Sequence, residues 1–450
     1  MKRALVVVVL WLSAALSGGA ADFPMVAENG ALRLTVESVR CAASYGENAA
    51  PQGRQWCVVR GSWANRIDAK RAAERELATQ YLAETLASHL YLVIDGAAVG
   101  LLQPQLADEA GRPAMAAIAL PKPGAVSAGD MVFDIPCGAY ASAELRFYDD
   151  ITGYLRLSLA GAPPEVKPVG PVLRNQVGEF ALFAVADPAP GPAAPAGLRA
   201  VSVELRARSQ WKTSGPAPQY DFAKPAGATV ERINLMDWPD TRKSFLLLAD
   251  GEYAYAAQGG TLPESARFLP EFFTGGTLIF LVPAQAKSLE LVGTLGHAAT
   301  EAGAIDIAPV RLSVGGGPAK PTAWTMSLKL SDEMFKVAVG VRRAATFAGE
   351  AAGEGMDFVV LDVGMENTGK GGEYFQPESQ LQLVTGEGEL LGCDEITGRG
   401  AHRPEAELYV PAGERRRCEL VFRVASGTSP KLNFRGGSFE EKHELPLWRP

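Results

Sequence analysis

Short stretches in which apolar and polar residues alternate recur along most of the chain, and clusters of Gly, Pro, Asp and Asn separate them. Alternation with a period of two places the apolar side chains on one face of a strand. That face can build a core while the opposite face meets water, as in antiparallel sheets. Many short strands divided by turn residues are typical of β-sandwiches. The pattern therefore predicts an all-β protein made of antiparallel sheets.

One strand pattern occurs three times, each time with a Val-Phe or Ile-Phe pair inside an apolar strand. The three phenylalanines are Phe133, Phe280 and Phe422. A second apolar strand follows each of them, and a strand that runs into a Gly turn precedes each of them. The preceding strands are Tyr91–Gly96, Leu246–Gly251 and Leu383–Gly386. Because landmarks in a fixed order indicate duplication, the sequence predicts three diverged copies of one module.

The third copy carries two further motifs. A strand that begins at Phe358 ends in Asn367-Thr-Gly, and a Pro411-Ala-Gly-Glu turn precedes the strand around Phe422. In these motifs the copy resembles the secreted immunoglobulin-like domains of unknown function that occur in bacterial lipoproteins and exported antigens. The resemblance implies an immunoglobulin-like sandwich and a location outside the cytoplasm, and it implies no activity and no functional residue. It reaches the first two copies only through the internal repeat.

Two joins rich in Pro and Gly, Ala162–Pro171 and Gly315–Pro321, divide the chain. We therefore expect three tandem immunoglobulin-like antiparallel β-sandwiches, at residues 22–163, 171–316 and 322–450. Pro-rich joins act as semi-rigid spacers, so the three domains are expected to swing only to a restricted extent.

Residues 68–90 depart from the strand pattern, because they are rich in Ala, Glu, Arg and Leu and contain no Gly or Pro. Ala78, Leu82 and Leu86 recur at a spacing that puts them on one face of a helix. The spacing predicts an amphipathic helical insertion over residues 68–90 in the first sandwich. We expect this helix to pack over the sandwich, and a docking helix for a partner is the alternative.

The first residues predict export. Lys2 and Arg3 precede an apolar run, Ala4–Leu16, and small residues follow up to Ala21. A charged start, a short apolar stretch and a small-residue exit are typical of a secretory signal peptide, here residues 1–21. The run is shorter than the ~20 residues that a membrane span needs. We therefore expect a periplasmic or extracellular protein with no transmembrane segment in the mature chain.

The net charge of the chain argues against some classes of binding partner. Removal of Lys2 and Arg3 with the signal peptide changes the formal net charge from −8 to −10. An acidic protein repels phosphate backbones and anionic lipid headgroups, which argues against binding to nucleic acids or membrane surfaces. We expect the partner to be an unknown protein or a component of the cell envelope.

The chain has five cysteines, and an oxidising compartment makes disulfides favourable. Cys393 and Cys418 are alone in the last third of the chain, and we expect them to pair. Cys41 and Cys57 bracket a hairpin loop and are the favoured second pair, which leaves Cys137 free. A bond between Cys57 and Cys137 is the alternative. Because no Cys-x-x-Cys occurs, neither a thioredoxin-like site nor a cysteine zinc site is expected.

Motifs that carry catalytic chemistry are incomplete. The segment Gly364–Gly371 has the spacing of a phosphate-binding loop, but Gly371 stands where that loop needs Ser or Thr, and the glycines that follow cannot begin a helix. The four histidines are scattered singly, and neither His-Glu-x-x-His nor a Gly-x-Ser-x-Gly motif occurs in the mature chain. We therefore expect no cofactor, no metal ion and no enzymatic activity.

Aromatic residues remain as candidates for binding. Phe272 and Phe273 lie between strands of the second copy, and with Trp238 they are the best candidates for a binding surface. We expect a non-catalytic exported binding or scaffold protein that acts through the surfaces of its sandwiches. One alternative is an accessory protein that binds carbohydrate or a cell-envelope polymer, which needs a row of exposed aromatic rings from Trp211, Trp238 and Trp324. The other is a hydrolase with an unrecognised site.

Overall fold

The computed structural model describes residues 22–96, 98–162, 165–191, 193–294, 297–300, 303–317, 319–320, 324, 326, 328–331, 333–436 and 442–448. The expected signal peptide, residues 1–21, lies outside them. In the described residues the strand pairs are almost entirely antiparallel and the helices are few and short, which confirms the predicted all-β class. The helices are α1 (Ala69–Glu74), α2 (Thr241–Ser244) and α3 (Pro377–Gln380). None of the helices in this part of the chain has the length and hydropathy needed to cross a membrane.

Internal contacts divide the chain into two compact units. The N-terminal unit runs to Val166 and takes in Lys212–Asn234 and Phe272–Thr274. The C-terminal unit contains Lys167–Trp211, Leu235–Glu271 and the chain from Gly275 onward. Most of the second expected domain and all of the third thus belong to one compact unit.

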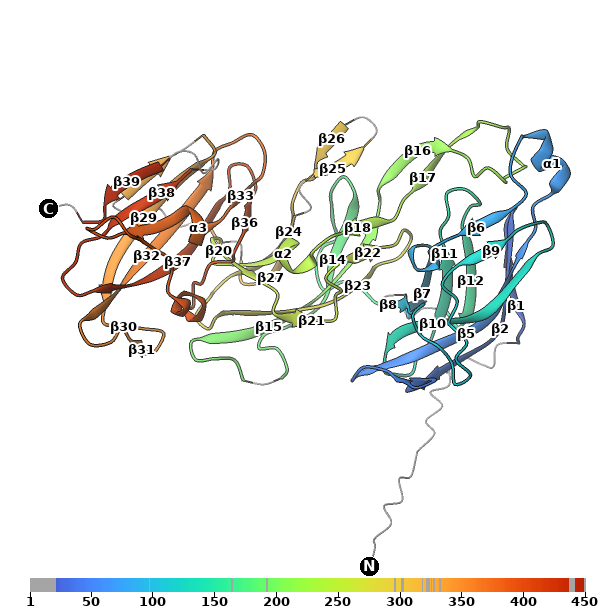
Figure 1. The fold of residues 1–450 in the computed structure, drawn as a ribbon, viewed down its shortest axis with the longest axis horizontal. Coiled ribbons are helices and arrows are strands. Elements are labelled where there is room, and N and C mark those ends of the chain that lie inside the picture. The colour runs from blue at the N-terminus through green and yellow to red at the C-terminus, as the bar shows by residue number, and fades with distance from the viewer. Residues whose placement is uncertain are drawn as a thin grey trace, which may run out of the picture. The chain divides into compact units, whose positions relative to one another are not determined.

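The N-terminal unit contains an eight-stranded sheet (Figure 1), and its side chains form one large core. One half of the sheet has the order β1 (Met25–Glu28), β2 (Leu32–Ala42), β5 (Arg54–Asn65), β10 (Val126–Pro136). The other half has the order β8 (Ala98–Leu102), β7 (Leu90–Ile94), β11 (Ala143–Phe147), β12 (Leu155–Ala160). The halves join where Phe133 pairs with Leu102. Apolar side chains from both halves form the core, in which the ring centres of Trp63 and Phe147 are 4.9 Å apart.

Short ribbons complete the N-terminal unit. They are β3 (Ser44–Tyr45) with β4 (Asn48–Ala49), β6 (Tyr81–Ala83) with β9 (Ile118–Leu120), and β16 (Lys212–Pro216) with β17 (Thr229–Ile233). The loop between β16 and β17 contributes Tyr220 to the core, and the Tyr220 hydroxyl donates to the carbonyl of Ala78 at 2.8 Å. This contact explains why Lys212–Asn234 belongs to the N-terminal unit although the expected second domain contains it.

The helix expected over residues 68–90 is wrong in length. Helix α1 begins after Asp68, whose carboxylate accepts from the amides of Lys70 and Arg71, and it ends before Glu76, where φ is 56°. Strand β6 and a single 3-10 turn, η1 (Leu86–Ser88), follow. Leu82 is 59% exposed between two buried neighbours, so the segment has the period of a strand. Pairing of β6 with β9 satisfies its backbone, and this tertiary contact outweighs the helical propensity of the sequence.

The C-terminal unit contains three sheets of four or more strands. A five-stranded sheet has the order β13 (Leu173–Arg174), β14 (Gly178–Ala186), β15 (Leu198–Ser209), β23 (Thr274–Pro283), β21 (Gly259–Gly260). An eight-stranded sheet has the order β27 (Val310–Gly315), β24 (Leu289–Gly293), β19 (Phe245–Ala249), β20 (Tyr253–Ala256), β37 (Arg415–Ala425), β32 (Met356–Asn367), β29 (Phe335–Ala344), β28 (Leu328–Ser331). A four-stranded sheet has the order β35 (Leu390–Leu391), β34 (Leu381–Val384), β38 (Lys431–Arg435), β39 (Lys442–Pro446).

The eight-stranded sheet of the C-terminal unit is continuous because Tyr253 of β20 pairs in parallel with Arg417 of β37. Two cores lie in this unit, one around Trp238 and Phe280 and one around Phe335 and Phe422. Ribbons and one 3-10 turn complete it: β18 (Met236–Trp238) with β22 (Ala266–Phe268), β25 (His297–Thr300) with β26 (Gly303–Asp306), β30 (Thr346–Phe347) with β31 (Glu350–Ala351), β33 (Glu373–Phe375) with β36 (Leu408–Val410), and η2 (Glu395–Arg399).

Two groups of four strands share one arrangement. The order β1-β2-β5-β10 in the N-terminal unit corresponds to β28-β29-β32-β37 in the C-terminal unit. Phe133 pairs with Cys57 in the first group, and Phe422 pairs with Val359 in the second. These two pairs align the groups residue by residue. Phe133, Phe280 and Phe422 lie in the long strands β10, β23 and β37, and each is 0% exposed.

A buried asparagine ends the second long strand of each group. Asn65 ends β5, and its amide donates to the carbonyls of Thr79 and Leu120. Asn367 ends β32, and its amide donates to the carbonyls of Gly371 and Val410. The oxygen of each side chain accepts from the backbone amide two residues further on. Each asparagine therefore ties the end of its strand to the ribbon that follows.

Candidate functional site

A pocket of about 440 Å³ lies on the outer face of β2, β5 and β10 in the N-terminal unit. Residues directly opposite one another on paired strands share a face of the sheet. The pairing places Ser38, Arg60 and Asp130 in one row across the three strands. Arg40 lies opposite Val58 in the next row. The floor of the pocket is therefore a polar strip on a sheet whose other face is core.

The β3–β4 hairpin forms one wall of the pocket. The ring of Tyr45 is 2% exposed, and its hydroxyl donates to Asp130 Oδ2 at 3.2 Å. Trp56 of β5 holds the hairpin in place, because its indole N–H donates to the carbonyl of Asn48 at 2.9 Å. A side chain at Gly46, where φ is 57°, would collide with the carbonyl of Ala107. Glycine at this position therefore lets the hairpin pack against the opposite wall.

The loop after β8 forms that opposite wall, and a carboxylate holds its turn together. Asp108 Oδ1 accepts from the amides of Ala110 and Arg112, each at 2.9 Å. The guanidinium of Arg112 donates to Asp108 Oδ2 at 2.7 Å, and this bond lowers the pKa of the Asp108 carboxyl. Leu106 and Ala114 flank the turn and pack in a small apolar cluster with the hairpin. Both walls of the pocket are thus held by hydrogen bonds and apolar contacts.

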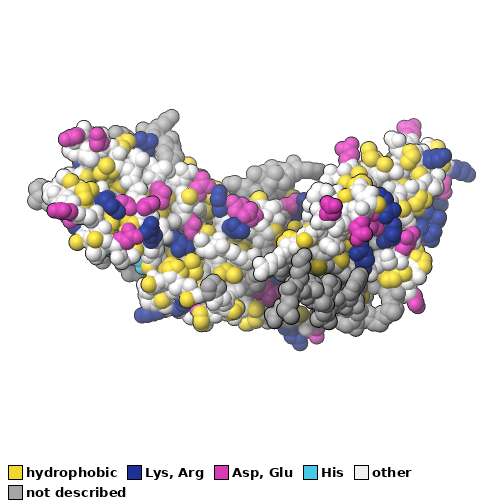
Figure 2. All heavy atoms as spheres, turned by 60° about the horizontal axis from the view of Figure 1, so that its bottom comes forward, with side chains coloured by type: hydrophobic (Ala, Val, Ile, Leu, Met, Phe, Trp, Pro, Cys, Tyr) yellow, Lys and Arg dark blue, Asp and Glu magenta, His cyan; other side chains and the backbone are white. Residues whose placement is uncertain are grey.

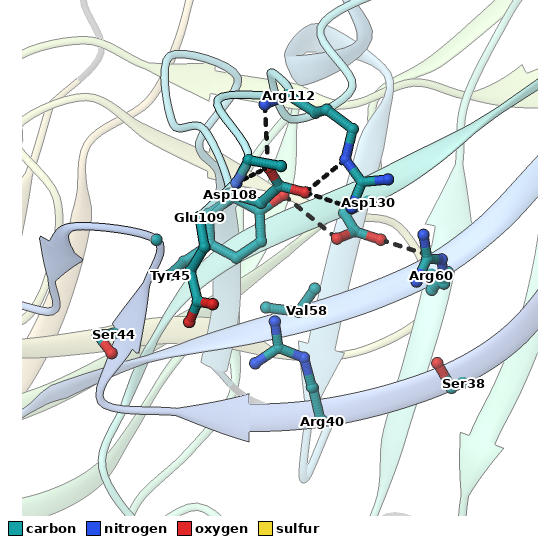
Figure 3. Close-up of a pocket in the computed structure, with 12 residues that line it drawn as sticks. Ser38, Arg40, Ser44, Tyr45, Val58, Arg60, Asp108, Glu109, Arg112 and Asp130 are labelled. Carbon is teal, nitrogen blue, oxygen red and sulfur yellow. Dashed lines mark hydrogen bonds and ion pairs between the residues drawn. The ribbon is translucent and has the colours of Figure 1, made fainter.

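Charges in the pocket are mixed, and most of them are paired. Arg112 pairs with Asp108 at 2.7 Å, and Arg60 pairs with Asp130 at 3.7 Å (Figure 3). Burial and the charge of Asp130 raise the pKa of Tyr45 to about 12, so the phenol stays a hydrogen-bond donor at neutral pH. Arg40 and Glu109 have no ion-pair partner in the described part of the chain, and Figure 3 draws no interaction to either.

The chemistry of this pocket suits recognition by hydrogen bonds and ion pairs. Its hydroxyl groups are those of Ser38, Ser44 and Tyr45, and no histidine is among the residues that line it. Across the described residues, His, Cys, Asp and Glu form no cluster with the arrangement of a metal site. Basic and acidic side chains are interspersed over the face drawn in Figure 2. The pocket therefore offers hydroxyl groups and charged groups of both signs on its lining.

All five cysteines are free thiols in the structure, so neither expected disulfide is present in it, although the expected partners are neighbours. Cys41 and Cys57 lie directly opposite each other on β2 and β5. Cys393 packs against the core cluster that contains Cys418, and burial together with the nearby Cys393 raises the pKa of the Cys418 thiol. Cys137 lies beyond the end of β10, where its exposed thiol donates to the carbonyl of Arg54. This arrangement favours the Cys41–Cys57 pair over the alternative pair of Cys57 with Cys137.

Oxidised mature protein is therefore expected to contain one free thiol per chain. Titration with a thiol reagent in denaturant should count one thiol before reduction and five after it, because the chain has five cysteines. The Cys137→Ser variant should count none before reduction. Three or more thiols in the oxidised wild-type protein would contradict the two expected pairs.

The aromatic residues that were expected to form a binding surface are buried or partly buried. Trp238 is fully buried in the core of the C-terminal unit, where its ring stacks on Phe245 with ring centres 4.8 Å apart. Its ring is therefore not available to a ligand at the surface. Phe272 and Phe273 are partly buried, and the guanidinium of Arg146 lies over the ring of Phe272 at 4.9 Å.

The tryptophans that a carbohydrate-binding row requires are also not exposed together. Trp211 is half-buried and packs against the core that contains Trp238. Trp324 is half-buried, with the guanidinium of Arg415 over its ring at 4.7 Å. Atoms of that ring also lie so close to Gly364 that a Cβ there would have no room. These three rings therefore give no support to a flat aromatic platform.

None of the residues that form the pocket was singled out from the sequence. The only sequence signals there are Arg40 and Arg60 within apolar strands and an Asp108-x-x-Gly-Arg turn, and each of these is common. Comparison with models of known protein families gives no match, and comparison with curated protein sequences gives none at the significance required.

Proposed function

We propose that the chain is an exported, non-catalytic binding protein that holds a polar, carboxylate-bearing ligand in the pocket over β2, β5 and β10. The observation that carries this proposal is Arg40, an exposed guanidinium without an acidic partner among the described residues, on the floor of a walled pocket. Arginine presents paired donors that match the geometry of a carboxylate. Arg60 and Arg112 are paired with Asp130 and Asp108, and Glu109 repels a carboxylate, so Arg40 is the group left to bind the ligand.

We also propose that the architecture is three tandem immunoglobulin-like sandwiches derived from one module. The shared strand order, the equivalent pairs of Phe133 and Phe422, and the equivalent asparagines Asn65 and Asn367 support copies one and three. The buried Phe280 in β23 supports copy two. The charged start and apolar run at residues 1–21 support export.

Thermal shift on residues 22–450 tests the binding proposal with matched pairs of probes, one of which carries a carboxylate and the other none. N-acetylglutamate and glucuronate are expected to raise the melting temperature, whereas N-acetylglutamine α-amide and glucose, which carry no carboxylate, are not. A ligand at a concentration of about 100 times its dissociation constant adds about 2.7 kcal/mol to the free energy of unfolding. The Glu109→Gln variant should show a larger shift with the acidic probes, because it removes a like charge from the rim. Equal shifts from the charged and uncharged probes would overturn the proposal.

A further inference from the structure

Strands β10 and β37 hold equivalent places in the two corresponding groups of four strands. They differ in what pairs with one of their two edges. On one side each is paired throughout its length, β10 with β5 and β37 with β32. On its other side β37 receives β20, and the amide of Arg417 donates to the carbonyl of Glu252 at 3.0 Å. The alignment set by Phe133 and Phe422 makes Ala128 the counterpart of Arg417.

The corresponding edge of β10 is open at Ala128. This side of β10 pairs with β8 only at Phe133 and Asp134, and the carbonyls of Asp130 and Val132 accept from two loop amides. Because those carbonyls point away from β5, the backbone groups of Ala128, two residues before Asp130, point the same way. No described residue pairs with Val126–Gly129 on that side. Val126 is 61% exposed, and Ala128 is exposed as well.

The contact of β20 with β37 shows what such an edge binds in this chain. β20 is a short extended strand, and Glu252 precedes it with its carboxylate 3.9 Å from the guanidinium of Arg417. Tyr255 of β20 donates to the carbonyl of Ala401 at 2.7 Å. The ring of Tyr253 stacks on His402 with ring centres 4.0 Å apart. The edge therefore binds an extended segment through its backbone and an acidic side chain, while Ala401 and His402, which lie beside β37 through the bond from Glu419 N–H to the His402 carbonyl, contact the two tyrosines.

The two units carry the arginine near this edge on different strands. In the C-terminal unit Arg417 lies on the receiving strand itself and also binds Asp362 of the neighbouring strand. In the N-terminal unit Ala128 stands in place of Arg417, and Arg60 stands in place of Asp362. Arg60 lines the pocket together with Arg40 and also lines a second hollow that reaches Ala128. An acidic side chain on a segment at the β10 edge thus has arginine within the same hollow.

We infer that the ligand of the pocket is an extended polypeptide segment of a partner protein, which adds to the open edge of β10 and places an acidic side chain toward Arg60 and Arg40. This inference rests on the proposed function and names its ligand class. Strand addition gains affinity from main-chain hydrogen bonds and specificity from side-chain pockets. Here the open N–H and C=O groups of Ala128 supply the main-chain hydrogen bonds, and the arginines supply the specificity for an acidic side chain.

The probe is a fluorescein-labelled peptide with the sequence of Ala249–Ala256, which contains Glu252 and both tyrosines. Fluorescence anisotropy with residues 22–450 is expected to show saturable binding. The Glu252→Gln peptide should bind more weakly, by about tenfold or more, because it loses the charge that pairs with arginine. In wild-type protein, hydrogen exchange of the Val126–Gly129 amides should slow when the peptide is added.

The Ala128→Pro variant removes the open amide at an edge position where proline is tolerated. It should weaken peptide binding about tenfold while leaving N-acetylglutamate binding unchanged, which shows that the pocket is intact. If the peptide binds with no change in exchange at Val126–Gly129, or fails to bind while N-acetylglutamate binds, the inference is overturned and the proposed function stands. If the wild-type chain dimerises and Ala128→Pro abolishes the dimer, a second copy of the chain occupies the edge. This result would also overturn the inference.

Discussion

Phe133→Ala, Phe280→Ala and Phe422→Ala are each expected to lower the free energy of unfolding by about 3–5 kcal/mol. Each ring is 0% exposed on a long central strand, and each belongs to a different core cluster. Close-packed interiors do not collapse fully around a missing ring, so the cost includes both lost burial and a cavity. Urea unfolding followed by tryptophan fluorescence measures the effect, because tryptophans lie in the first two of these cores.

The control for these three variants is Val169→Ala. Val169 is 66% exposed, so its truncation should change the free energy of unfolding by no more than about 0.5 kcal/mol. A Phe280→Ala variant as stable as this control would remove β23 from the set of equivalent strands. The three-module architecture would then lose its second copy.

Glu414→Gln is expected to destabilise the C-terminal unit by about 3–5 kcal/mol, because it leaves a buried arginine without its counter-charge. Arg416 is 2% exposed, and its guanidinium lies 2.9 Å from Glu414. Burial alone would raise the pKa of Glu414, but the charges of Arg416 and Arg311 outweigh it and lower that pKa. The stabilisation by Glu414 is therefore complete above its unfolded pKa of ~4.3 and is lost as the pH falls below that value.

Two controls separate this buried pair from ordinary charge effects. Arg416→Met removes the charge and keeps most of the volume, so it should be close to neutral or stabilising. Glu231→Gln breaks an exposed pair with Lys212 and should cost less than about 1 kcal/mol. Midpoints of thermal unfolding at pH 7 compare the three variants. Equal losses for Glu414→Gln and Glu231→Gln would show that the Arg416 site is open to water.

The strands could be predicted from the sequence because their local pattern agrees with the fold. The alternation around Phe133, Phe280 and Phe422 gives the strands and their buried faces directly. The prediction of one helix over residues 68–90 was wrong because the short helix α1 and the short strand β6 both have a helix-favouring composition. Only the pairing of β6 with β9 distinguishes the strand from the helix. The place of Lys212–Asn234 depends on long-range contacts of Tyr220, which no local pattern contains.

The pocket could not be predicted because its residues meet only through strand register. Leu32, Leu34 and Val36 of β2 face the core, and strict alternation would turn Arg40 toward the core as well. A bulge at Glu37 shifts the register between Val36 and Ser38, so Arg40 faces outward instead. A shift of one residue reverses the faces of every side chain that follows. The sequence carries no clear mark of this bulge.

Isothermal titration calorimetry of N-acetylglutamate with two matched arginine variants tests the pocket most directly. Arg40 and Arg342 follow a valine near the ends of the corresponding strands β2 and β29, but Arg342 pairs with Glu419 at 3.1 Å, whereas Arg40 has no acidic partner among the described residues. We predict that Arg40→Ala raises the dissociation constant by about tenfold or more and that Arg342→Ala leaves it unchanged. Equal affinities of the two variants would contradict a carboxylate site at Arg40.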